Sequence, residues 1–74
     1  MILQTIIFPR SLFKLKEAKR WITEHGYKLS FYGKEVDVKP TQYRFRQSTP
    51  LKKVNNGSYK TIKLENGILF VFVV

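Results

Sequence analysis

The sequence predicts an α+β fold in which one amphipathic helix packs on a mostly antiparallel sheet of four or five strands. Three observations lead to this prediction. An apolar, β-branched segment opens the chain, a single stretch with helical periodicity follows it, and two strand-like segments flank Asn66-Gly67 near the end. The 74 residues suffice for one domain, which we place over residues 1–74.

The first two elements are predicted by their apolar patterns. Residues 1–8 are mostly apolar and β-branched, which is typical of a strand. From about residue 14 to residue 25, charged side chains cover one helical face. The opposite face carries Ala18, Trp21 and Ile22 at helical spacing. We therefore expect Trp21 in the core, and a short strand over residues 36–38 further along the chain.

The segment "QYRFRQ" within residues 41–47 predicts a strand with two unlike faces. Successive side chains of a strand point to opposite sides, so Tyr43 and Phe45 share one face and Arg44 and Arg46 share the other. We expect the aromatic face to belong to the core and the arginines to face a partner.

Residues 59–65 and 68–74 flank Asn66-Gly67, the strongest short-range signal for a β-hairpin. A two-residue turn would pair Leu64 with Leu69 and Ile62 with Val71. This register places a second apolar row on the face that a single helix leaves uncovered, and such a patch is larger than monomers usually expose. A second copy of the chain is the expected cover, in a homodimer. The predicted interface consists of Tyr59, Ile68, Phe70, Phe72 and Val74.

Charge points to a polyanionic partner. Fourteen basic residues against five acidic ones give a net charge of +9, and the stretch from Lys39 to Leu64 holds seven cations and no acid. Arg44 and Arg46 are about 7 Å apart along their strand, close to the spacing of successive phosphates. The predicted nucleic-acid contacts are Arg44, Arg46, Lys52, Lys53, Lys60 and Lys63.

Several function classes find no support in the residues. The chain has no cysteine, one histidine, five dispersed acids and no glycine-rich phosphate loop. We expect no catalytic residue, no metal site, no cofactor and no enzyme activity, and we assign His25 a structural role at the end of the helix. The longest apolar run, residues 68–74, is far shorter than a membrane span, so a membrane partner is not favoured.

Four stretches taken together resemble a known family. They are "FKLKEAKRWITEHGYK" (residues 13–28), "VDV" (36–38), "YRFRQSTP" (43–50) and "YKTIKLENGILFV" (59–71). Their order is similar to a small domain found in proteins of large eukaryotic DNA viruses and near phage head-maturation proteases. It most resembles the small basic virion proteins of the Marseilleviridae, a family of giant viruses. The resemblance implies a viral setting, in the virion and the infected host cell (cytoplasm or nucleus), and self-association; it supplies no catalytic motif.

The residues and the resemblance together predict a non-enzymatic, basic viral accessory or virion protein that binds nucleic acid non-specifically as a homodimer. Arg44 and Arg46 would contact phosphates, with the lysines adding unspecific attraction. The alternative is a protein–protein interaction module that docks on an acidic viral or host partner. In that case the same arginines would pair with carboxylates.

Overall fold

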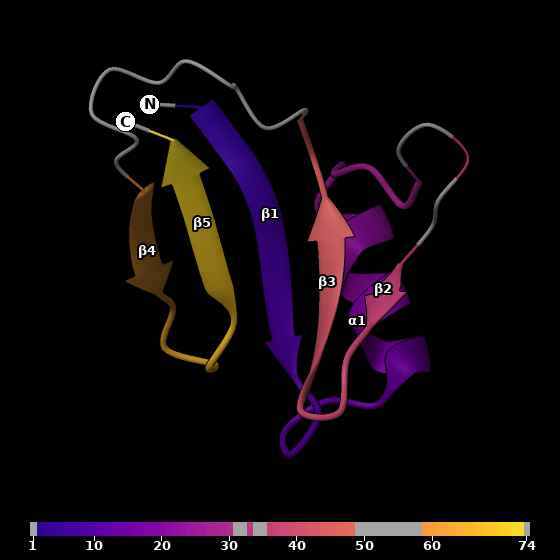
Figure 1. Cartoon of the computed structure of the whole chain (residues 1–74). Coiled ribbons are helices and arrows are strands. Elements are labelled where there is room, and N and C mark those ends of the chain that lie inside the picture. Colours follow the sequence, from indigo (N-terminus) through magenta and orange to yellow (C-terminus); the bar gives the residue numbers. More distant parts are fainter. Residues whose placement is uncertain (1, 31–32, 34–35, 49–58, 74) are drawn as a thin grey trace.

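Five strands and one helix make up the described part of the chain, which in this computed structural model comprises residues 2–30, 33, 36–48 and 59–73. The elements are β1 (Ile2–Pro9), α1 (Leu15–Glu24), β2 (Asp37–Val38), β3 (Gln42–Arg46), β4 (Tyr59–Lys63) and β5 (Leu69–Val73). The strands form one antiparallel sheet in the order β2-β3-β1-β5-β4 (Figure 1). The predicted α+β class is therefore confirmed.

The first strand of the chain is the central strand of the sheet. On one side of β1, Ile6 pairs with Phe45 of β3, and on the other side it pairs with Phe70 of β5. Residues directly opposite each other in neighbouring strands share a face of the sheet. Ile6, Phe45 and Phe70 therefore form one row across three strands, on the face that α1 covers.

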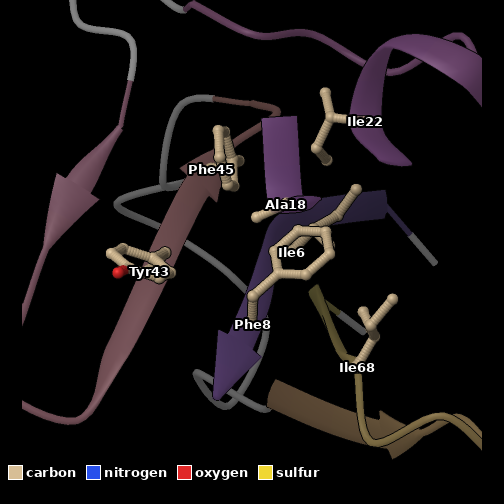
Figure 2. Close-up of a cluster of buried hydrophobic side chains, with 7 residues drawn as sticks. All are labelled: Ile6, Phe8, Ala18, Ile22, Tyr43, Phe45 and Ile68. Atoms are coloured by element: carbon tan, nitrogen blue, oxygen red, sulfur yellow. The ribbon is translucent and has the colours of Figure 1, made fainter. Parts of the chain in front are cut away.

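The core lies between this face and α1. The helix contributes Ala18 and Ile22, which are fully buried. The ring of Phe8, from β1, lies at the centre of the core (Figure 2). Phe8 makes edge-to-face contacts with Phe13, Trp21 and Phe45 at centroid distances of 5.3, 5.7 and 5.5 Å. Among the described residues, the buried cluster consists of Ile6, Phe8, Ala18, Ile22, Tyr43, Phe45 and Ile68. The prediction that the aromatic face of "QYRFRQ" belongs to the core is confirmed.

The helix ends in a Schellman motif built on Gly26. Gly26 has a φ of 75°, and its N–H donates to Thr23 O at 3.2 Å. The N–H of Tyr27 donates to Ile22 O at 3.0 Å, which completes the motif. The turn brings the Tyr27 ring parallel to that of Trp21, with centroids 5.9 Å apart.

A buried glutamine ties the segment after the helix to the sheet. The side-chain amide of Gln47 accepts from Lys28 N–H and donates to Lys28 O, each at 2.9 Å. The main-chain N–H of Gln47 donates to Gln4 O at 2.6 Å, where the β1–β5 register shifts between Leu3 and Thr5. One residue therefore links the helix exit, the end of β3 and the irregular part of β1.

The predicted hairpin register is wrong by one residue. Ile62 pairs with Phe70 and Lys63 with Leu69, and Leu64 N–H donates to Ile68 O at 2.8 Å. The turn therefore contains three residues, 65–67, with Gly67 at a φ of 92°. Three-residue loops that place glycine in a left-handed conformation are the common alternative to the two-residue turn. The longer turn places Leu64, which packs partly buried against the core, on the same helix-covered face as the fully buried Ile68.

The pairing of β5 with β1 and the shifted register of β4 together overturn the predicted dimer surface. Phe70 faces the helix side, where its ring centroid lies 6.0 Å from Trp21 and 5.6 Å from Tyr27. Phe72 lies beside Phe70 on the same face, at 6.2 Å, whereas Tyr59 lies on the opposite face. Ile68 is buried within the chain, and Val74 lies outside the described residues. These five residues therefore do not form one exposed row, and the predicted interface is wrong. Self-association itself stays a prediction.

Replacement of Gly67 tests the left-handed conformation in the hairpin turn. Gly67 has a φ of 92°, and an added Cβ would meet Leu12 Cδ1, the end of an exposed side chain that can move. We expect Gly67→Ala to lower the free energy of unfolding by about 1–3 kcal/mol, measured by chemical denaturation. Gly26→Ala, at a position that also has a positive φ, should cost a similar amount. A Gly67→Ala protein as stable as the parent would contradict this geometry.

Trp21 is expected to contribute strongly to stability although it is only partly buried. Its indole contacts Phe8, Tyr27 and Phe70, so truncation removes ring contacts with both layers of the fold. We expect Trp21→Ala to cost about 3 kcal/mol in equilibrium unfolding. The exposed His25, whose ring stacks on Trp21 at 3.8 Å, serves as control, and His25→Ala should cost much less. A Trp21→Ala protein as stable as the parent would show that the indole is not a core residue.

Candidate nucleic-acid interface

The sheet face opposite α1 carries a different set of side chains from the core face, and we call it the outer face. Its members follow from the strand register, since they alternate with the core residues of each strand. They include Thr5 and Ile7 of β1, Arg44 and Arg46 of β3, Leu69 and Val71 of β5, and Tyr59, Thr61 and Lys63 of β4.

The middle of the outer face is an apolar strip. Ile7 lies directly between Arg44 and Leu69 of the neighbouring strands, and only 7% of its surface is exposed. Thr5 lies between Arg46 and Val71 and is 5% exposed. Cross-strand neighbours have Cβ atoms about 5 Å apart, so an arginine stem can cover β1 while its guanidinium stays in water.

Cations border this strip on both sides. Arg44 and Arg46 lie on β3, and Lys63 lies on β4, three strand spacings away. With about 4.8 Å between strands, the two cationic borders are about 14 Å apart. Arg44 is half-buried, whereas Arg46 and Lys63 are exposed.

The structure brings together only part of the predicted cation set. Arg44, Arg46 and Lys63 share the outer face. Lys60 pairs with Phe72, so the corrected register places it on the helix side of the edge strand. Lys52 and Lys53 lie outside the described residues.

Few carboxylates lie near the cationic borders: among the described residues, Asp37 of β2 neighbours Arg44, and Glu65 follows Lys63 in the hairpin turn. The described residues of β1, β3, β4 and β5 include no carboxylate. Asp37 of β2 is opposite Arg44 in the register, but its carboxylate is 3.4 Å from Lys39 Nζ, in a pair whose side chains are about half exposed. The positive charge of the outer face is therefore mostly uncompensated along these four strands.

Arg10 is an ordered cation that the sequence did not single out. Its guanidinium lies 5.3 Å from the Tyr43 ring centroid, and Nη1 donates to Lys39 O at 3.0 Å. These contacts hold the β2–β3 turn against the end of β1. A lone arginine after a proline carries no pattern that predicts such a role.

His25 has contacts that suit a structural role. Its ring stacks on Trp21, and Nδ1 lies 2.8 Å from Trp21 O. Because a carbonyl oxygen only accepts, Nδ1 is the nitrogen that donates in this contact. Within the described ranges, no three His, Asp or Glu side chains lie close enough together to hold a metal ion. No helix in that part of the chain is long and apolar enough to cross a membrane.

Comparison with known proteins gives no relative from which a function can be transferred. No family model matches the chain, and no match was found among curated proteins or solved structures. The arrangement of the outer face is therefore the basis for a functional proposal.

Proposed function

We propose that this protein is a non-enzymatic module that binds nucleic acid through its phosphate backbone, with the outer face as the contact surface. The observation that carries the proposal is the placement of Arg44, Arg46 and Lys63 along the borders of a strip without carboxylates. Ionised donors of this kind make strong, charge-assisted bonds to phosphate oxygens. The net charge of +9 adds long-range attraction.

Binding of this kind is independent of base sequence. Sequence is read by hydrogen bonds to base edges, whereas phosphate contacts set position and affinity. The strip between the cations consists of Ile7, Leu69 and Val71, with hydroxyl groups only at Thr5 and Thr61. Such a surface offers few donors or acceptors for base readout.

The positions of the aromatic side chains disfavour a base-stacking platform. Sheets that bind single strands expose aromatic rings beside cations on one face. Here Tyr43 and Phe45 belong to the core, and Tyr59 at the edge is the one ring on the outer face within the described residues. Backbone contact is therefore favoured over stacking.

The second candidate is docking on an acidic protein. An apolar centre with a charged rim is also the composition of many protein interfaces, and the half-buried Leu69 and Val71 beside the buried Ile7 fit that description. In this case Arg44 and Arg46 would pair with carboxylates. Binding of an acidic protein without binding of nucleic acid would favour this candidate.

The viral setting belongs to the same proposal and has a different basis. It rests on the sequence resemblance to small virion proteins, which implies a protein of the virion and the infected host cell. Recovery of the protein from purified virions would test that part independently of its binding chemistry.

Removal of the two arginines tests the proposed surface. We expect Arg44→Gln/Arg46→Gln to weaken binding to a mixed-sequence DNA duplex and to reduce the slope of log affinity against log salt by about two. The measurement is fluorescence anisotropy at several salt concentrations. Lys16→Gln/Arg20→Gln is the matched control, because it removes the same charge from the exposed side of α1.

An equal loss in both variants would contradict the outer face as the site, since it would show that net charge alone governs binding. Affinity that does not change with salt would contradict the phosphate mechanism itself. Thermal unfolding of each variant shows whether a loss of binding reflects a loss of folded protein.

A further inference from the structure

β4 is an edge strand whose five residues are all exposed. Such an edge presents unpaired backbone groups that can pair with another strand. The other edge is less suited to pairing, because β2 has two residues and is followed by Pro40. Among the described strands, β4 therefore provides one long edge without a partner strand, and this edge borders the outer face.

The backbone groups that point outward from β4 follow from the hairpin. Leu64 N–H donates to Ile68 O, and hydrogen-bonded pairs alternate along an antiparallel ladder. Ile62 and Lys60 therefore bond to β5. Tyr59, Thr61 and Lys63 direct their N–H and C=O groups to the free edge.

We propose that two copies of the chain pair through β4 when both are bound to one nucleic acid, antiparallel about a two-fold axis at Thr61. The inference rests on the proposed function for its nucleic-acid step. Two-fold pairing places Thr61 opposite the partner's Thr61 and Lys63 opposite the partner's Tyr59. Each residue that directs its backbone groups to the free edge is then opposite such a residue of the partner. Each of these three pairs exchanges two backbone hydrogen bonds, about six in total.

The side-chain pairs of this arrangement suit a second copy of the same chain. Lys63 lies opposite the aromatic ring of the partner's Tyr59, and Lys60 lies opposite the partner's Ile62. No two like charges are therefore directly opposite each other. The two-fold axis of an antiparallel pair is perpendicular to the sheet, so both outer faces lie on the same side. One polyanion can then contact the cations of both copies.

The pair presents two sets of arginines to one polyanion. From β3 of one copy to β3 of the other there are seven strand spacings, so the two sets formed by Arg44 and Arg46 are at most about 34 Å apart. Adjacent strands of a sheet are rotated by about 20–25°, which shortens this separation and turns the two sets in different directions. A duplex of about 20 bp, which is about two turns long, is therefore long enough to contact both sets.

Nucleic acid is required because the free edge is protected by charge. Lys60 and Lys63 lie on β4, and charged edge residues oppose strand addition. Two free copies would bring a charge of +18 together, twice the +9 of one chain. Phosphates reduce that repulsion, so pairing and binding favour each other.

Thr61→Pro tests the pairing, because it removes an outward N–H and leaves the bonds to β5 intact. Thr61→Val is the matched control, since it also lacks the hydroxyl but keeps the N–H. On a DNA duplex of about 20 bp, which holds two copies, we expect the parent and Thr61→Val to bind with a Hill coefficient approaching 2 and Thr61→Pro with one of about 1. On a duplex of about 10 bp the two variants should bind equally.

Hydrogen exchange gives a second readout that needs no variant. The amides of Tyr59, Thr61 and Lys63 should exchange rapidly in the free protein and slowly on the longer duplex. Non-cooperative binding by the parent, cooperative binding by folded Thr61→Pro, unprotected outward amides in the complex, or β4 pairing without DNA would each overturn the proposal. Loss of all binding would instead refute the proposed function on which the pairing rests.

Discussion

The structure depends on one packing constraint: the central strand has two faces, and the described part of the chain has one helix to cover them. On one face of β1, Ile6 and Phe8 are buried beneath α1. On the other face, Thr5 and Ile7 are buried although no described helix lies above them. Arg44 is the half-buried cross-strand neighbour of Ile7 on β3, and its side chain has a long apolar stem with a charged end. A cation of the outer face can therefore contribute to packing as well as to charge.

The central position of β1 also determines which backbone groups remain available. Because β1 pairs with both β3 and β5, the chain's last two strands extend the sheet outward and leave β4 at its edge. The cationic face and the unpaired edge meet at Lys63, which belongs to both. Backbone pairing at this edge would extend the cationic face without any change in sequence, which is why we connect the two features in one functional proposal.

Local patterns predicted much of the fold. The helical spacing of Ala18 and Ile22 and the alternation of Tyr43 with Arg44 each identified the buried side correctly. The hairpin register was missed because Asn66-Gly67 is compatible with a two- or a three-residue turn. The three-residue turn places Leu64, which packs against the core, on the same face as Ile68, and it moves Lys60 to that face as well. The side of β5 that the helix covers depends on the pairing of Phe70 with Ile6 of β1, a non-local contact that also removes the predicted dimer surface.

The most direct test of the central claim, that nucleic acid contacts the sheet face opposite the helix, is an NMR titration of ¹⁵N-labelled protein with a short DNA duplex. The outer face should respond first, with the largest shifts at the amides of β3 around Arg44 and Arg46 and at Lys63, and with the guanidinium signals of both arginines perturbed. Shifts confined to the exposed side of α1, around Lys16 and Arg20, would contradict the claim and assign the binding surface to the helix.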